Sequence, residues 1–173
     1  HPNSRRQRQM CIRDRAWAIS ANNGRIKWKI DAIGNDTNLI SNNSPATSKK
    51  YAVFGFGNGE IYTTFKKGGY VLWSSSLSGR NDGRVISAID DIVASPVIVG
   101  RNVFVADGSG KVVSIKVESG QRNWTAPFGS SGNLWVAGKS LFFISNTNHL
   151  VRLKIKTGDV VWMTELPSFS KKR

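Results

Sequence analysis

The sequence predicts an all-β fold made of a repeated antiparallel unit, because a glycine and a tryptophan four residues apart occur four times. Successive tryptophans of this set are separated by 45, 51 and 38 residues, a period that fits one small sheet per copy. Turn clusters and short alternating runs fill the space between the copies. The architecture that these features predict is a partial β-propeller of four-stranded antiparallel blades. The four pairs are Gly24 and Trp28, Gly69 and Trp73, Gly120 and Trp124, and Gly158 and Trp162.

Each glycine of the set is predicted to close a hairpin. The alternating run at 113–117 leads directly to Gly120, and a hairpin there needs a residue that adopts positive φ without steric cost. The next strand then carries Trp124 at a fixed place. A tryptophan at the same place in every repeat is best explained as an apolar plug between neighbouring units, with its indole N–H hydrogen-bonded.

Two further strands are predicted upstream of each glycine. Apolar runs at 51–56, 102–106 and 140–144 are each followed by a cluster of Gly, Asn, Ser or Thr. Ser44–Pro45 and Ser95–Pro96 precede the first two of these runs and are 51 residues apart, the same offset as Trp73 to Trp124. One unit therefore contains four short strands, the content of a propeller blade.

The length of the chain does not suit a complete propeller of roughly four to eight blades. At about 45 residues per repeat, the 173 residues hold about three blades plus a remnant, so the ring is not closed and the chain is interpreted as a fragment. We expect the propeller fragment at 16–166, a basic disordered end at 167–173, and a non-native or disordered basic tail at 1–15, part of which resembles a translated sequencing adapter. Within the fragment we expect a blade remnant at 16–32 and blades at about 45–77, 92–128 and 132–166.

The charge is strongly basic, with a formal net charge of +14. Five arginines against one aspartate in residues 1–15, and three basic residues at 171–173, account for half of it. The remaining Lys and Arg fall in different repeats, which is typical of a solvated outer surface. A nucleic-acid site would need clustering on one surface with stacking aromatics, so we predict no nucleic-acid partner.

Residues that could perform catalysis or hold a metal are few. The single cysteine, Cys11, lies in the doubtful tail, and no second histidine accompanies His149 in the blades. Asp90 and Asp91 are adjacent, so on a strand their side chains would point to opposite faces. We therefore expect no catalytic residue, no metal and no cofactor. No run of 18 apolar residues is present, which excludes a transmembrane helix from this sequence.

Three segments carry a resemblance to a known family: 95–104, 134–138 and the run Thr157–Trp162. Their pattern of strand, turn, strand, Thr-Gly and Trp resembles the PQQ-like repeat of quinoprotein propellers. Over residues 39–166 the chain is similar to the BamB family of outer-membrane β-barrel assembly lipoproteins. The resemblance implies a non-catalytic scaffold on the periplasmic face of the outer membrane of a Gram-negative bacterium, attached to the membrane only by a lipid anchor in an N-terminus absent from this sequence.

Two other functions remain open. PQQ-dependent dehydrogenases share the repeat and bind PQQ and calcium on the propeller axis through inward carboxylates, commonly beside a pair of cysteines. This sequence has no such cysteine pair and few acidic residues outside turns. The third possibility is a generic propeller adaptor or sugar-binding module. A lipid-modified cysteine with about eight blades would favour the assembly role, whereas an axial carboxylate set would favour the enzyme.

The resemblance also implies a partner surface. In the family, two adjacent loops between blades bind the periplasmic domains of the central barrel protein, and they match the connections 33–44 and 78–91 here. Leu39 matches an apolar contact and Asp91 a carboxylate, whereas Ile40 stands in place of an arginine. The alternative is that Leu39 and Asp91 only cap strands. If they do form one surface, both connections must leave from the same rim of the arc.

Overall fold

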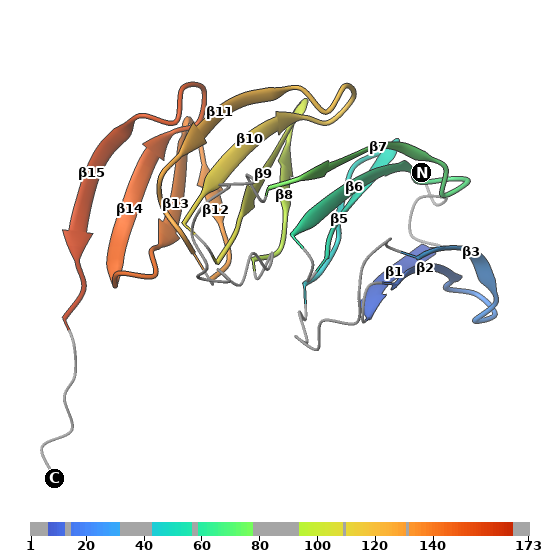
Figure 1. The fold of residues 1–173 in the computed structure, drawn as a ribbon. Helices are drawn as coiled ribbons and strands as arrows, with labels where there is room; N and C mark the ends of the chain where they lie inside the picture. Colours follow the sequence, from blue (N-terminus) through green and yellow to red (C-terminus); the bar gives the residue numbers. More distant parts are fainter. Residues whose placement is uncertain are drawn as a thin grey trace, which may run out of the picture.

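The structure is a computed structural model that describes residues 15–31, 43–56, 59–77, 94–108, 110–130 and 132–167, and the backbone of 7–12. Every regular element in these residues is a strand, and the strands form one three-stranded and three four-stranded sheets. Figure 1 shows the four sheets side by side along an open arc. The predicted fold class, a partial propeller of about three blades plus a remnant, is confirmed.

Each sheet uses consecutive strands in order, and every neighbouring pair is antiparallel. The first sheet contains β1 (Gln7–Ile12), β2 (Arg15–Ser20) and β3 (Ile26–Asp31). The second contains β4 (Ala46–Thr47), β5 (Tyr51–Gly55), β6 (Glu60–Phe65) and β7 (Val71–Ser76). The third contains β8 (Val97–Val99), β9 (Asn102–Ala106), β10 (Val112–Lys116) and β11 (Arg122–Ala126). The fourth contains β12 (Trp135–Ala137), β13 (Ser140–Ile144), β14 (His149–Lys154) and β15 (Val160–Glu165).

Strand β1 differs from the expectation of a tail without structure at 1–15. It pairs with the whole of β2, from Gln7 opposite Ser20 to Ile12 opposite Arg15. Such pairing satisfies the backbone N–H and C=O groups of an edge strand and demands no particular side chain, which is why the residue pattern gave no sign of it. Residues 1–6, 13–14 and 168–173 lie outside the described part of the chain.

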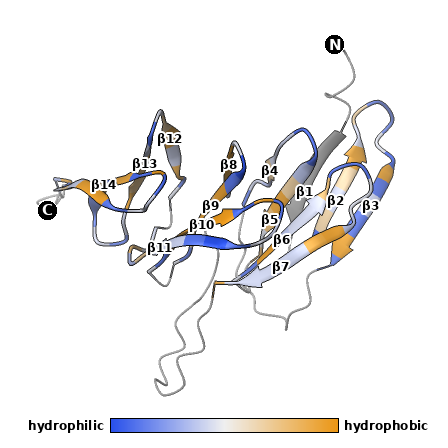
Figure 2. Ribbon diagram, turned by 90° about the horizontal axis from the view of Figure 1, so that it is seen from above, coloured by the Kyte–Doolittle hydropathy of each residue, from blue (hydrophilic) through white to orange (hydrophobic). Residues whose placement is uncertain are grey.

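The hydrophobic core lies between the sheets, so the middle strands of the second and third sheets are buried on both faces. In β5, Ala52 and Phe54 pack toward the first sheet, whereas Val53 packs toward the third. In β9, Val103 packs toward the second sheet and Phe104 toward the fourth. This two-sided burial explains the near-continuous apolar runs in these strands. Figure 2, seen from above, shows the sheets following one another along the arc.

The four predicted glycine turns share one geometry. Gly24, Gly69, Gly120 and Gly158 have φ of 69°, 71°, 71° and 77°, and each amide N–H donates to the carbonyl oxygen four residues earlier at 2.8–2.9 Å. Positive φ is the conformation for which glycine is needed. The prediction of a hairpin glycine in every repeat is therefore correct.

A β-bulge precedes the tryptophan in every sheet. Between the last two strands the register shifts by one residue, so that Lys27, Leu72, Asn123 and Val161 are the extra residues. A bulge bends its strand and increases the local twist, which re-aims the side chain that follows. The following side chain is the tryptophan each time.

Three of the four tryptophans dock on the glycine turn of the next sheet. A methyl group placed on Gly69 would lie 2.6 Å from Cδ2 of Trp28, and the distance is 2.9 Å for Gly120 and Trp73. Trp124 covers Gly158 in the same way, at 2.7 Å. This is the predicted plug between units, and only a residue without a side chain leaves room for the ring.

The indole N–H of each docked tryptophan also crosses to the next sheet. Its Nε1 donates to the carbonyl oxygen of the residue three before the glycine. The acceptors are Lys66 for Trp28 at 3.1 Å, Val117 for Trp73 at 2.7 Å and Ile155 for Trp124 at 3.1 Å. A buried indole that keeps its hydrogen bond costs little polar desolvation.

The tryptophans are equivalent in strand position but not in burial. Trp28 is 9% exposed, Trp73 and Trp124 are half-buried, and Trp162 is 37% exposed. The expectation of four buried tryptophans is therefore wrong for Trp162. The reason is that its burial depends on a following glycine turn, and no such turn lies against it in the described part of the chain.

Because a tryptophan ring lies on Gly120 but not on Gly24, replacement by alanine should lower the free energy of unfolding by different amounts at these two glycines. Gly24→Ala should lower the free energy of unfolding by about 1–2 kcal/mol, the cost of a left-handed alanine, since nothing lies within 4 Å of the new methyl group. Gly120→Ala should cost about 1–3 kcal/mol more, because its methyl group meets Trp73. Urea denaturation of both variants measures the difference. Equal losses would show that the tryptophan does not occupy the turn.

Candidate functional site

The predicted partner residues Leu39, Ile40 and Asp91 lie outside the described residues, in the segments 32–42 and 78–93. What the structure does place are the strands that bound these two segments. One joins β3 to β4 and the other joins β7 to β8. The position of the candidate site therefore follows from where these strands end and begin.

Both segments belong to one rim of the arc. A sheet of four antiparallel strands brings the chain back to the side on which it started, so the strands that bound each connection end and begin on that side. The hairpins β5–β6, β9–β10 and β13–β14 lie on the same side, whereas the glycine turns lie on the opposite one. We call the first side the connection rim and the other the turn rim.

The three connections differ in length. The chain between β3 and β4 has 14 residues, between β7 and β8 it has 20, and between β11 and β12 it has 8. Loops carry binding residues more often than the scaffold that holds them. The two long connections are adjacent, and they are the two that contain the predicted partner residues.

A hydrogen bond joins the ends of the two long connections. The backbone N–H of Ser44 donates to Oγ of Ser95 at 3.1 Å, although these serines are 51 residues apart. Beside them, Asn43 and Ala94 are buried. The Ser-Pro pairs that the sequence aligned by offset are therefore neighbours in space, and the structure brings the last residues of the two connections together.

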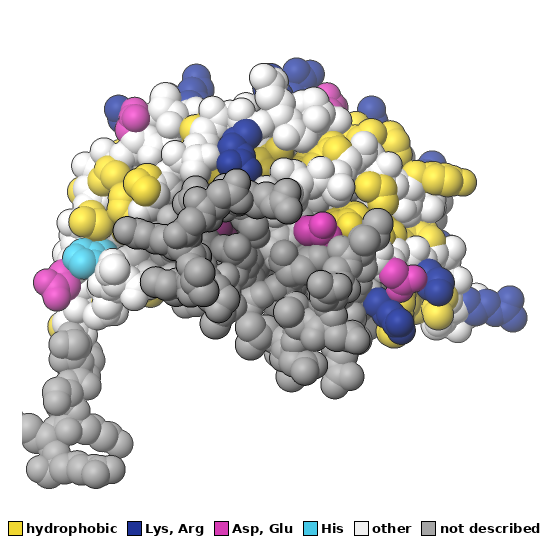
Figure 3. Space-filling view, viewed as in Figure 1, with side chains coloured by type: hydrophobic (Ala, Val, Ile, Leu, Met, Phe, Trp, Pro, Cys, Tyr) yellow, Lys and Arg dark blue, Asp and Glu magenta, His cyan; other side chains and the backbone are white. Residues whose placement is uncertain are grey.

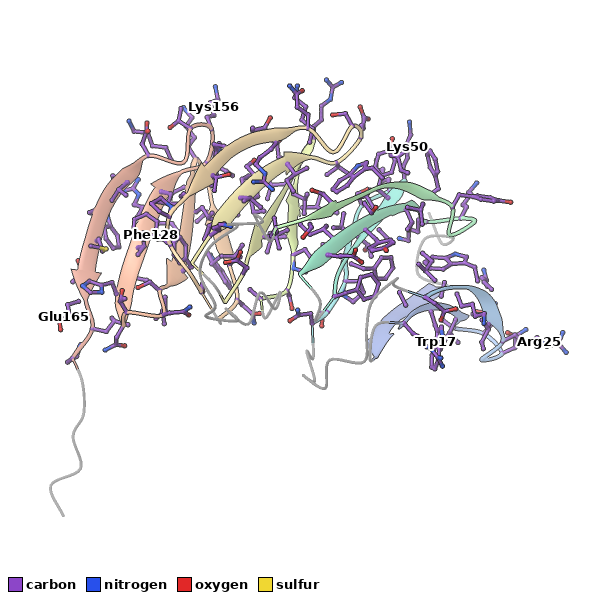
Figure 4. The ribbon with its side chains drawn as sticks, viewed as in Figure 1. Trp17, Arg25, Lys50, Phe128, Lys156 and Glu165 are labelled. Atoms are coloured by element: carbon purple, nitrogen blue, oxygen red, sulfur yellow. The ribbon has the colours of Figure 1, made fainter. Side chains whose placement is uncertain are left out.

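The short third connection is closed by contacts of its own. Ser130 is buried, and its hydroxyl donates to the carbonyl oxygen of Ile144 at 2.8 Å and accepts from the backbone N–H of Gly132 at 3.2 Å. Phe128, labelled in Figure 4, packs against Phe143 with ring centroids 6.1 Å apart. The side chains of this segment therefore contact the fourth sheet. The two longer connections remain the candidates for binding a partner.

Two titratable groups on the connection rim, Asp107 and His149, form hydrogen bonds within their own turns. Asp107 is buried, and its Oδ1 accepts from the backbone N–H groups of Gly110 at 2.9 Å and Lys111 at 2.7 Å. Nδ1 of His149 lies 2.7 Å from the carbonyl oxygen of Thr147, within its own hairpin. The Thr147 hydroxyl, 3.1 Å from Nδ1 of His149, belongs to the same hairpin, so both titratable groups are engaged in the hydrogen bonds of their own turns.

Side chains that could ligate a metal ion are dispersed in the described residues. No three His, Cys, Asp or Glu side chains gather there as a metal ion would require. The described part of the chain also contains no apolar helix of membrane-spanning length.

The basic residues gather on the turn rim, which the sequence analysis did not foresee. Lys50, Arg101 and Lys139 occupy the same position in three successive sheets, where the carbonyl oxygen of each accepts from the start of the neighbouring glycine turn at 2.8–3.0 Å. Figure 3 shows Lys and Arg along the upper edge of the molecule, and Figure 4 labels Lys50 and Lys156 there. The signal was present in the sequence, since aligning the repeats by strand places these three cations at one position. The described connection rim is less basic and carries Glu60, Asp107 and Glu165.

Comparison with known proteins identifies relatives of the sequence. A family model described as "Outer membrane protein assembly factor BamB" matches residues 7–164. The chain is similar to the outer membrane protein assembly factor BamB of Moranella endobia, with 23% identity over 145 residues, 84% of this chain and 37% of the relative. It is also similar to that of Escherichia coli, with 25% identity over 124 residues, 72% of this chain and 32% of the relative. The chain thus spans about a third of the length of these relatives.

Solved structures resemble the fold. BamB from Moraxella catarrhalis matches with a TM-score of 0.77 and 17% identity, over 92% of this chain and 49% of that one. Quinohemoprotein alcohol dehydrogenase from Comamonas testosteroni matches with a TM-score of 0.81 and 12% identity, over 92% of this chain and 33% of that one. At such identities the likeness concerns the fold alone, and it does not separate a scaffold from an enzyme.

Proposed function

The chain belongs to the family of the outer membrane protein assembly factor BamB, and from this premise we propose that it is a non-catalytic scaffold of the outer-membrane β-barrel assembly machinery. In this role it binds the periplasmic domains of the central barrel component. It works at the periplasmic face of the outer membrane of a Gram-negative bacterium and reaches the membrane only through a lipid anchor. Because the chain spans about a third of its relatives, this activity is proposed for the whole protein of which it forms part.

The single observation that best supports the proposal is the hydrogen bond between Ser44 and Ser95. It joins the ends of two long connections that come from different sheets and follow the same rim. Two loops held together on a rigid scaffold can form one continuous surface, which is how propellers present binding residues. The shorter third connection is held to its own sheet by the hydrogen bond from Ser130 to Ile144. The two long connections therefore remain the candidates for binding a partner.

The proposed contacts are an apolar anchor and a charge. Leu39 supplies the anchor, Ile40 extends it, and Asp91 pairs with a cation of the partner. Most of the binding energy of such interfaces lies in a few central residues surrounded by polar ones. The family resemblance implies a second carboxylate at position 93, where this chain has Val93, so Asp91 alone would carry the charge on that connection.

The dehydrogenase alternative has less support. Its structural likeness to this chain is one of fold, at 12% identity. Of the described carboxylates on the connection rim, Asp107 accepts hydrogen bonds within its own turn and Glu60 accepts one from the Tyr62 hydroxyl at 3.1 Å. Stabilisation of the full-length protein by PQQ with Ca²⁺ would distinguish the dehydrogenase from the scaffold.

We predict that Leu39→Ala combined with Asp91→Arg weakens binding of the full-length protein to the periplasmic domains of the central barrel component by more than about 2 kcal/mol. The variant loses the apolar anchor and turns an attraction into a repulsion. Isothermal titration of the purified domains measures the change in Kd, which should rise at least about 30-fold.

The matched control is Lys156→Ala, which removes an exposed cation from the opposite rim (Figure 4) and should leave Kd unchanged. Circular dichroism should report the same fold for both variants, since neither change touches a core described between the sheets. Unchanged binding by the folded double variant would remove Leu39 and Asp91 from the partner surface.

We also predict that PQQ together with Ca²⁺ leaves the stability of the full-length protein unchanged. A cofactor present at 100 times its Kd would raise the free energy of unfolding by about 2.7 kcal/mol. Urea denaturation with PQQ and Ca²⁺, compared with Ca²⁺ alone, makes the measurement. A rise of that size would favour the dehydrogenase over the scaffold.

A further inference from the structure

The turn rim holds most of the cations in the described turns. The structure describes every residue of the seven turns on this rim, which are 21–25, 48–50, 66–70, 100–101, 117–121, 138–139 and 155–159. They contain eight Lys and Arg against two acidic residues. The described residues between strands on the connection rim contain one cation, Lys111, and one acid, Asp107. In the described turns, basic charge therefore gathers on one side of the scaffold.

Three of these cations are presented from fixed backbone positions. Lys50, Arg101 and Lys139 are exposed, and the carbonyl oxygen of each is held by the neighbouring glycine turn at 2.8–3.0 Å. The ion pairs that the described residues form are elsewhere, at Asp31 and Asp159. The three side chains thus point their charge outward from successive sheets without an acidic partner in the described part of the chain.

The two acidic residues of these turns offset little of this charge. Asp159 is engaged in its own turn, where it accepts from the hydroxyl of Thr157 at 2.7 Å and lies 3.7 Å from Nζ of Lys154. Glu118, in the third sheet, is the other acid. Like charges gathered on one surface repel one another, and an anionic partner would relieve that repulsion.

An exposed aromatic ring lies among these cations. Tyr70 is 76% exposed and follows Lys66 and Lys67 in the turn of the second sheet. A methyl group placed on Gly68 would lie 2.6 Å from Cε2 of Tyr70, so the ring lies across its own turn. Val71, next in the chain, is 47% exposed. Aromatic rings beside Lys and Arg are typical of surfaces that lie at the level of lipid headgroups. The second sheet has neighbours on both sides, so this exposure does not come from an end of the arc.

The extent of the charge indicates an extended partner. The cations of the turn rim come from all four sheets, from Arg25 in the first to Lys156 in the fourth, and Figure 3 shows them along the upper edge of the molecule. A small anion would contact one turn, whereas an anionic bilayer surface would contact the turns of several sheets at once. Single-stranded nucleic acids are bound with several stacking aromatic rings, and the described turns of this rim contain only Tyr70.

We propose that the turn rim docks on an anionic phospholipid bilayer. Lys50, Arg101 and Lys139 lie against the phosphate groups, and Tyr70 lies at the level of the headgroups. The lipid anchor of the proposed function is then not the only contact with the membrane, since the rim adds a reversible one held by charge. A partner on the connection rim would face away from the bilayer, so both could be bound together. The inference rests on charge and exposure and is independent of the contacts proposed for Leu39.

Co-sedimentation with vesicles tests the proposal, using the full-length protein produced without lipid modification. The wild type should bind vesicles of equal parts phosphatidylglycerol and phosphatidylcholine at low salt, and should not bind phosphatidylcholine alone. Each Lys or Arg near an anionic bilayer strengthens binding about fivefold. Replacing Lys50, Arg101 and Lys139 together by Gln should therefore raise the lipid concentration for half-maximal binding at least about tenfold. Added salt should weaken binding of the wild type, because it screens exposed charges.

The matched control replaces Arg15, Lys29 and Lys111 by Gln, which removes the same formal charge away from the turn rim and should leave vesicle binding unchanged. Circular dichroism should show that both triple variants remain folded. A wild type that fails to bind the anionic vesicles would overturn the proposal. Equal weakening by the two triple variants would show that net charge acts rather than the rim. Release from the vesicles by polyglutamate at equal charge concentration would overturn the bilayer as the partner and indicate an acidic polypeptide instead.

Discussion

The stacking of an indole ring on a glycine turn is the contact on which the other features of this fold depend. It joins one sheet to the next, and it requires two residues from different repeats, the tryptophan and the glycine that makes room for it. The bulge before each tryptophan aims the ring, and the hydrogen bond from Nε1 fixes its orientation. Because this contact repeats, the core between sheets repeats. The antiparallel order of the strands then brings the described ends of the two long connections to the opposite rim, where the docking surface with Leu39 and Asp91 is proposed.

Much of the fold could be predicted from the sequence because its signals are local. A glycine with positive φ and a tryptophan four residues later belong to one hairpin, and both were found from spacing alone. The bulge could not be found, since Lys27, Leu72, Asn123 and Val161 share no chemistry. The exposure of Trp162 depends on a neighbouring sheet, and the pairing of β1 depends on backbone groups.

The candidate site was predicted in part. The four antiparallel strands of the second sheet place the described ends of both connections on one rim, and this follows from the repeat. The bond between Ser44 and Ser95 could not be predicted, because it depends on how two sheets pack. The contacts of Leu39, Ile40 and Asp91 remain predictions from family resemblance. The basic turn rim was missed because the charges were counted along the chain, whereas Lys50, Arg101 and Lys139 gather through strand position.

A double-mutant cycle between Trp28 and Gly69 tests the central claim, that ring and glycine form one contact. The measurement is the free energy of unfolding in urea for Trp28→Ala, Gly69→Ala and the double variant. With Trp28 present, the methyl group that Gly69→Ala adds would lie 2.6 Å from the ring, and Trp28→Ala removes that contact. The double variant should therefore lose at least about 1 kcal/mol less than the sum of the single losses. Additive losses would contradict the claim that the glycine is required by the tryptophan.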